Sequence, residues 1–473
     1  MLFQSVEYLI LLFVVFVFYW TICRKNKNRQ NILIVLASSV FYGWWSWRFL
    51  GLLLLTAFST FFAGYFMDKT TNKQERKALS VTAIVLNIGI LFFFKYFNFF
   101  VQAFIDAFSL FGIHVSVSSL NILLPIGISF YTFTALSYSI DVYHEKIKPT
   151  HDVLAYLAYL MFFPSILSGP ISRAQKQLPQ YFLPRNFNYD KIVIGCKLML
   201  FGSVMKLCLA DRLGIYVDAV YTNIAQHNGT TLFFTSILYT IQIYADFAGY
   251  SLMAIGSGKL LGIDLQVNFL RPYFAKTVTD FWRRWHISLT TWFRDYIYFS
   301  LGGNRCGRAR WILNTMIVFV VSGLWHGAAY TFLIWGVIHG VCMVIERLMY
   351  GEKIKAISDK FSFANVLRLI LTFTIVNFAW IFFRVNDMEQ VMIIFRKIFT
   401  EPGMLFFDSN TLLLAFLAMT IVFGYDFVKE RQLEFHLLSS KYRVVRYITA
   451  AILICYILAF GVLNSGSFIY FQF

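Results

Sequence analysis

The sequence has 473 residues, of which 59% are hydrophobic, 19% are aromatic and only 14% are charged. Soluble domains carry about 25% charged residues, and the mean hydropathy of +0.64 likewise excludes an ordinary soluble protein. The net charge of +17 lies in short blocks between apolar runs, which is typical of membrane loops. This distribution argues against nucleic acid as a partner and favours the lipid bilayer and an anionic substrate.

Apolar runs recur from end to end, so we expect a single integral membrane domain over residues 1–473. Because a span needs about 20 apolar residues, the runs predict an all-α polytopic membrane protein with about 10–12 transmembrane helices plus re-entrant and interfacial helices. The first run, residues 8–23, precedes a basic block and lacks a cleavage site. This pattern indicates a retained span rather than a signal peptide.

Proline and glycine interrupt two of the apolar runs. One run contains Pro125 and Gly127, and the next contains Pro164 and then Gly169-Pro170. Irregular backbone at membrane depth is tolerated only where protein buries it or a cavity hydrates it. The two breaks therefore predict an internal chamber.

The basic loops predict the orientation of the chain. Residues 24–29 and 69–77 form two basic loops separated by two short runs, so both can be cytoplasmic. A further basic stretch, residues 429–446, precedes one final run, which carries residues 464–473 across the membrane. We therefore expect both termini to be extracytoplasmic.

Six cysteines are scattered along the chain without paired spacing, and most lie inside apolar runs. A buried thiol in such a run behaves as a small hydrophobe. The spacing predicts neither a disulfide framework nor a metal site.

The segment 271–310 carries eight Arg or Lys against two Asp, together with Trp282, Trp285 and Trp292. Two interpretations fit this composition. One is an amphipathic cytoplasmic loop that binds headgroups. The other is a basic mouth for an anionic donor such as coenzyme A or a phosphopantetheinyl carrier. The donor-binding candidates are Arg283, Arg284, Trp285 and Arg294.

Three histidines lie in or beside apolar sequence: His286, His326 and His339. A histidine in an apolar run must face protein or water, because lipid satisfies none of its polar atoms. A lone buried histidine is more often structural than catalytic. Two of them, one flanked by small residues in Ser322-Gly323-Leu324-Trp325-His326-Gly327, favour a catalytic role. A neutral imidazole near pH 7 is a natural general base for a hydroxyl.

The block FWRRWHISLTTWFRDYIYFSLGGNR, followed by GLWHGAAYTFLIWGVIHG, resembles the bacterial membrane-bound O-acyltransferases (MBOAT). The resemblance is strongest to the alginate and peptidoglycan O-acetyltransferase branch and weaker to the teichoic acid D-alanyltransferase. Three further segments match other family motifs in order, namely residues 163–173, 244–256 and 378–384.

The resemblance implies a ring of helices around a central funnel in a bacterial cytoplasmic (inner) membrane. It also implies His326 as the signature catalytic residue and His286 as the second catalytic position. The donor thioester, acetyl-CoA or another acyl thioester, would enter from the cytoplasm as a substrate rather than a bound cofactor. The acyl group would leave on the other side.

The leading function is therefore O-acetylation of an extracytoplasmic polysaccharide such as alginate, directly or through an extracytoplasmic acetyltransferase partner. The first alternative is D-alanyl transfer to teichoic acid from an acyl carrier protein. A second alternative, from another class, is a polymer transporter or flippase, which would also contain broken helices and cationic loops.

Charged residues inside the matching motifs can be interpreted as structural rather than catalytic. Asp246 could pair with an arginine or could be a pore-lining acid, and the ion pair is favoured because unpaired acids within a membrane are costly. The same structural interpretation covers Arg173 and Arg384. The C-terminal tail has another candidate residue. It reads Phe468-Ile469-Tyr470-Phe471-Gln472-Phe473 and resembles the C-terminal motif of the small companion peptide in the D-alanylation system. That resemblance implies Tyr470 as an acyl shuttle, against the alternative of an interfacial aromatic belt.

Overall fold

The computed structural model describes residues 1–473 except 2, 113–119, 121, 352–361, 386, 434–436, 464–468 and 470–473. Over the described residues the regular secondary structure is helical, and none of it is strand. In the part of the chain that the structure describes, seven helical segments are long and apolar enough to cross a membrane: Trp47–Lys69, Lys73–Ser109, Tyr189–Tyr221, Tyr330–Tyr350, Phe363–Arg384, Ser409–Glu430 and Arg443–Phe460. The all-helical polytopic fold is confirmed, whereas the larger number of spans and the central funnel stay predictions.

The chain gathers into two compact units. The first unit consists of Met1–Cys196 and Ala254–Gln266, and the second of Lys197–Met253 and Val267–Phe473. The sequence-based expectation of one domain over residues 1–473 stays a prediction. All three histidines of interest and the whole basic segment 271–310 belong to the second unit.

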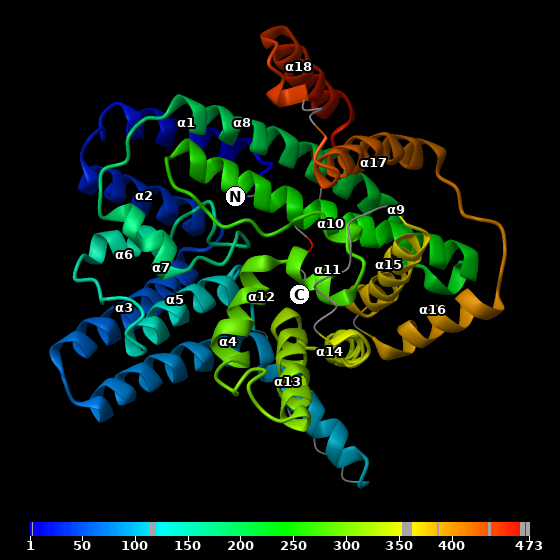
Figure 1. Ribbon diagram of the computed structural model, residues 1–473, viewed down its shortest axis with the longest axis horizontal. Helices are drawn as coiled ribbons and strands as arrows, with labels where there is room; N and C mark the ends of the chain where they lie inside the picture. The colour runs from blue at the N-terminus through cyan, green and yellow to red at the C-terminus, as the bar shows by residue number, and fades with distance from the viewer. Residues whose placement is uncertain are drawn as a thin grey trace. The chain divides into compact units, whose positions relative to one another are not determined.

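The first unit holds the early helices: α1 (Val6–Trp20), α2 (Lys27–Gly43), α3 (Trp47–Lys69), α4 (Lys73–Ser109), α5 (Ile128–Tyr143), α6 (Val153–Leu160) and α7 (Ala174–Gln177). Helices α3, α4 and α5 pack against one another (Figure 1). Two long helices are shared by the units, α8 (Tyr189–Ser203) and α10 (Gly229–Leu260).

The two Pro–Gly breaks meet inside the first unit. Gly127 has a positive φ of 77° and directly precedes α5. A Cβ on Gly127 would lie 2.8 Å from the Ile166 carbonyl oxygen and 2.9 Å from the Leu167 Cα, so only glycine fits this contact. The irregular backbone after α6 is buried, with Phe162 and Phe163 fully inaccessible. Protein therefore covers the irregular backbone, as a membrane environment requires.

In the second unit, the end of α8 leads directly into a π-helical stretch, Val204–Ala210. It continues with α9 (Asp211–Tyr221), α11 (Val278–Arg284), α12 (Ile287–Phe293), α13 (Arg308–His326), α14 (Tyr330–Tyr350), α15 (Phe363–Arg384), α16 (Met388–Thr400), α17 (Ser409–Glu430) and α18 (Arg443–Phe460). Figure 1 shows these helices in colours from green to red.

Helices α13 and α14 form a close hairpin because glycine occupies their contact. A Cβ on Gly323 would collide with the Phe332 carbonyl oxygen, and a Cβ on Gly336 would collide with the Phe319 carbonyl oxygen. Small residues at helix–helix contacts let backbones approach closely in membrane proteins. The hairpin fixes the end of α13, where His326 lies.

Large apolar side chains cover the outer faces of both units. Phe13 on α1, Val85 on α4, Leu371 on α15 and Phe416 on α17 are all at least 61% exposed. Exposed apolar surface on this scale is rare in water-soluble monomers. These side chains suit contact with lipid, in agreement with the multi-pass membrane fold.

Candidate active site

His326 is the last residue of α13 and is buried. Glycine follows it at position 327, where a Cβ would collide with the ring of Phe332. The imidazole is surrounded by aromatic rings, with centroids 5.0 Å away for Trp335 and 5.2 Å away for Phe383. The small residues expected around this histidine therefore serve tight packing of the α13–α14 turn.

His286 lies between α11 and α12 and is fully buried. Its backbone is left-handed, with φ 43° and ψ 53°, a conformation that non-glycine residues rarely adopt. Such strain persists only where the surrounding structure imposes it, and it often accompanies functional residues. Burial lowers the pKa of His286 to about 3, so the imidazole is neutral at physiological pH.

Asn268 holds the backbone that follows His286. Its carbonyl oxygen accepts the N–H of Ile287 at 3.0 Å, and its side-chain Oδ1 accepts the N–H of Ser288 at 3.3 Å. The Asn268 amide nitrogen donates to Ser251 Oγ at 3.1 Å. Asn268 was missed by the sequence analysis, since no spacing or motif marks it as a partner of the histidine.

The structure brings His286 and His326 together, with ring centroids 6.5 Å apart. Phe247 of α10 packs on His286 at 4.7 Å, and Trp325 lies 6.0 Å from the same ring. The late motif also contributes, because Trp380 packs on Trp335 at 5.7 Å. Residues far apart in the sequence thus enclose two neighbouring imidazoles in an apolar aromatic shell.

His339 has a structural partner instead. Its Nδ1 accepts the indole N–H of Trp282 at 3.3 Å, and its ring packs on Trp335 at 5.1 Å. It lies within α14 and is fully buried. One ring nitrogen of His339 therefore has a hydrogen-bond partner, which fits the structural interpretation of a buried histidine.

The basic segment 271–310 is not a helix lying on the surface with its aromatic residues outward. Trp282, Trp285 and Trp292 are at most 5% exposed. Glu346 of α14 accepts the N–H groups of Val278 and Thr279, which fastens the start of α11. The burial of its tryptophans disfavours the headgroup-binding loop and favours a structured site.

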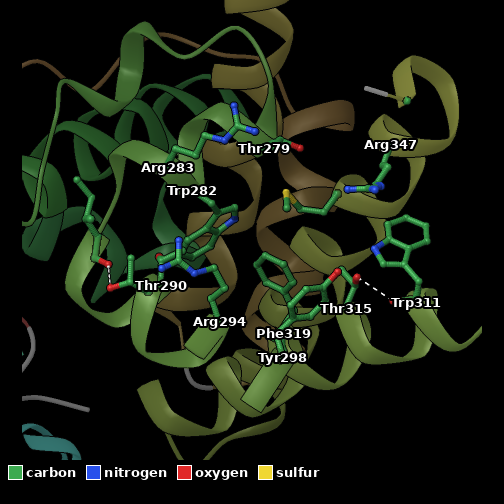
Figure 2. A pocket seen from close by; sticks show the side chains of 15 residues that line it. Thr279, Trp282, Arg283, Thr290, Arg294, Tyr298, Trp311, Thr315, Phe319 and Arg347 are labelled. Carbon is green, nitrogen blue, oxygen red and sulfur yellow. Dashed lines mark hydrogen bonds between the residues drawn. The ribbon is translucent and has the colours of Figure 1, made fainter. Parts of the chain in front are cut away.

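A cavity of about 510 Å³ opens beside this segment. Its volume lies within the usual range of small-molecule sites, about 300–1,000 Å³. Figure 2 shows Arg283, Arg294 and Arg347 around it, with Trp282 and Phe319 between them. Ile287, the residue after His286, also lines the cavity. The cavity thus combines an apolar wall, three guanidinium groups and proximity to the buried histidine.

The four donor-binding candidates separate into two groups. Arg283 and Arg294 line the cavity. Arg284 instead forms ion pairs with Asp280 at 3.0 Å and Glu430 at 2.8 Å. Burial alone would lower the pKa of Arg284, but the two carboxylates outweigh it and raise that pKa. Trp285 is fully buried against Trp380, 5.0 Å away, so Arg284 and Trp285 serve packing within the unit.

This separation predicts different defects for two adjacent arginines. Arg283→Gln should raise the KM for an acyl-CoA donor roughly 10–100-fold, the factor expected from losing one hydrogen bond to a charged group. Arg284→Gln should instead lower the melting temperature, because Asp280 and Glu430 lose their shared cation, while the donor KM stays unchanged. Thioester cleavage titrated with acetyl-CoA, together with thermal unfolding of both purified variants, measures the two effects. Equal donor KM values for Arg283→Gln and the wild type would contradict the assignment.

The structure contains two of the ion pairs that were expected within the motifs. Asp246 pairs with Lys206, and Arg384 pairs with Asp218, at 2.7 and 2.9 Å. Both residues therefore form ion pairs, although the partner of Asp246 is a lysine rather than the expected arginine. Arg173 is buried, with 8% of its surface exposed, and its expected ion pair stays a prediction. Tyr470 lies outside the described residues, so its role as an acyl shuttle stays a prediction.

Comparison with known proteins agrees with this architecture. The sequence profile of MBOAT, the membrane-bound O-acyltransferase family, matches residues 39–386. The chain is 36% identical to the "Probable alginate O-acetylase AlgI" of Pseudomonas aeruginosa, over 85% of this chain and 75% of that protein. It is 30% identical to the peptidoglycan O-acetyltransferase of Helicobacter pylori, over 78% of this chain and 73% of that protein.

A weaker similarity connects the chain to another transfer activity. It is 28% identical to the teichoic acid D-alanyltransferase of Bacillus subtilis, over 56% of this chain and 69% of that protein. The matched profile spans both histidine motifs, the mid-chain motif around Asp246 and the late motif around Trp380. The chain is therefore a multi-pass membrane protein that belongs to the membrane-bound O-acyltransferase family.

Proposed function

We propose that this acyltransferase moves an acetyl group from acetyl-CoA, on the cytoplasmic side, to an exported polysaccharide or to an extracytoplasmic acetyltransferase partner. The observation that carries the proposal is the buried His286–His326 pair beside a cavity lined by three arginines. Phosphate groups favour arginine for charge-assisted hydrogen bonds. The apolar wall of the cavity suits the acyl and pantetheine portions of a thioester donor.

In the proposed reaction, the neutral imidazole of His326 accepts the proton of an attacking hydroxyl. The hydroxyl oxygen forms a bond to the thioester carbonyl carbon, and the carbon–sulfur bond then breaks. The thiolate leaves and takes up a proton, which the imidazolium can return. A new oxygen ester and a free thiol result, so each transfer releases one equivalent of thiol.

Tyr470 is the proposed first acceptor. Its phenol, activated by His326, would form an aryl ester, which is a good leaving group for onward transfer to a polymer hydroxyl. The second transfer regenerates the phenol. With both termini extracytoplasmic, as the basic loops predict, the tail would deliver the acyl group on the outer side of a bacterial cytoplasmic membrane.

Two alternatives differ in what they predict. D-alanyl transfer would require a D-alanylated carrier protein as donor, and the identity and coverage of the relatives favour the O-acetylating branch over it. A flippase would move polymer without breaking a thioester. Neither the histidine pair nor the arginine-lined cavity is needed for that activity.

Thiol release separates these possibilities. We expect purified protein in lipid nanodiscs to cleave acetyl-CoA and to release coenzyme A, and His326→Ala to release little. A D-alanyl carrier protein would be offered in parallel at the same concentration. Cleavage of the carrier thioester alone would overturn acetyl transfer in favour of D-alanyl transfer, and cleavage of neither would overturn acyl transfer as the activity.

A further inference from the structure

A buried cluster of charged residues lies in the second unit, and none of them lines the arginine-lined cavity. Lys206, in the π-helical stretch, is 1% exposed and places its Nζ 2.7 Å from Asp211 Oδ1. The same Nζ lies 2.7 Å from Oδ1 of Asp246 on α10. Buried charges are costly unless they are paired and hydrogen-bonded. Here one buried cation contacts two carboxylates.

The second oxygen of Asp246 binds the C-terminal tail. The backbone N–H of Ile469 donates to Asp246 Oδ2 at 2.9 Å, a buried contact between residues 223 positions apart. Ile469 itself is 8% exposed. A hydrogen bond to an ionised acceptor is roughly twice as strong as a neutral one, and burial removes the competition from water.

Two further bonds hold the chain near the same segment. The N–H of Val462 donates to the Leu207 carbonyl oxygen at 3.0 Å, and Arg212 donates to the Phe460 carbonyl oxygen at 2.6 Å. The end of α18 and a residue of the tail are therefore both fastened to the region 206–212 and its partner Asp246. An aromatic belt at the membrane surface would require none of these bonds.

The tail contact lies close in sequence to the histidine site. Asp246 directly precedes Phe247, whose ring packs on His286 at 4.7 Å. Ile469 directly precedes Tyr470 in the sequence, so the bond at the Ile469 amide lies one residue before the proposed acyl carrier.

We infer that Asp246, held in place by Lys206, is the anchor that positions the C-terminal tail for acyl transfer. The inference rests on the proposed function for the positioning role, but not for the anchoring itself. Asp246 acts through the tail and is not among the residues that line the arginine-lined cavity, so it is a positioning residue. Its loss should lower turnover and leave the donor KM unchanged.

Protection of the tail from carboxypeptidase tests the anchor without any activity measurement. The tail of the wild-type protein in nanodiscs should be digested slowly, as followed by mass spectrometry. Asp246→Ala should accelerate digestion past Ile469 roughly 10–100-fold, the factor for one lost hydrogen bond to a charged group. Asp211→Ala is the matched control, because it also removes a carboxylate from Lys206 but not the acceptor of the Ile469 N–H.

A tail variant keeps the test valid if Asp246→Ala does not fold. Ile469→Pro removes the donating N–H and leaves the buried ion pairs intact, whereas Ile469→Ala keeps that N–H. We expect the proline variant alone to release the tail and to lower polymer acylation. Unchanged protection in Ile469→Pro would overturn the anchor. A released tail with normal acylation would overturn the positioning role.

Failure of acyl transfer as the activity and failure of Asp246 as the anchor give different results. If acyl transfer itself is the wrong activity, thioester cleavage is absent in the wild type while carboxypeptidase protection still depends on Asp246. If the anchor is wrong, the wild type cleaves acetyl-CoA and protection is indifferent to Asp246 and to the Ile469 N–H.

Discussion

His326→Ala is expected to lower acyl transfer roughly 10²–10⁴-fold, the usual loss when a general base is removed. The residue ends α13 within an aromatic shell, so alanine leaves a small cavity without disturbing the Gly323–Phe332 contact. The variant should insert and purify as the wild type does. Thioester cleavage and polymer acylation at matched expression measure the loss.

His339 supplies the control for His326. It belongs to the same hairpin and is equally buried, but its Nδ1 accepts the indole N–H of Trp282. The side-chain oxygen of asparagine can accept the same bond, so His339→Asn should retain most of the transfer rate. Near-normal acylation by purified His326→Ala would remove that residue from the mechanism, and loss in both variants would indicate a packing defect.

Tyr470→Phe is expected to abolish polymer acylation while thioester binding is kept. The substitution preserves the ring and removes only the hydroxyl, which is the proposed acyl acceptor. A residue of an interfacial belt would tolerate the change, because the ring alone provides its packing. Acylation of the polymer in cells, compared at equal membrane abundance, is the measurement.

Carboxypeptidase digestion of the same variant tests the anchoring of the tail by Asp246. Tyr470→Phe leaves the N–H of Ile469 in place, so the tail should remain as resistant to carboxypeptidase as in the wild type. Wild-type acylation by Tyr470→Phe would end the shuttle hypothesis and leave the anchor untouched. Loss of acylation with a protected tail would support both.

The membrane fold and the histidine pair could be predicted from the sequence because their signals are local. Apolar runs define the long helices, and the motifs around His286 and His326 are contiguous blocks. The Pro–Gly breaks predicted irregular backbone, and the structure buries Gly127 against Leu167. That the two breaks contact each other could not be foreseen, since nothing in either segment specifies the other.

The different roles of Arg283 and Arg284 could not be predicted from the sequence, for a geometric reason. Adjacent residues on an α-helix point about 100° apart, so one can line a cavity while its neighbour pairs with carboxylates elsewhere. The ion pair of Asp246 was predicted correctly, but the expected partner was an arginine. That the partner is Lys206 depends on the packing of α10 against the π-helical stretch. Asn268 carries no local signal at all.

The left-handed backbone at His286 restricts how this site can change during evolution. Asparagine and glycine adopt that conformation readily, whereas β-branched residues pay a high steric cost. If histidine is replaced at this position during evolution, few other amino acids are tolerated. Only those that adopt the left-handed conformation preserve the shape of the loop between α11 and α12. We therefore expect few amino acids at position 286 even in a relative that has lost acyltransferase activity. The residue at this position is for that reason a poor marker of activity unless His326 is considered with it.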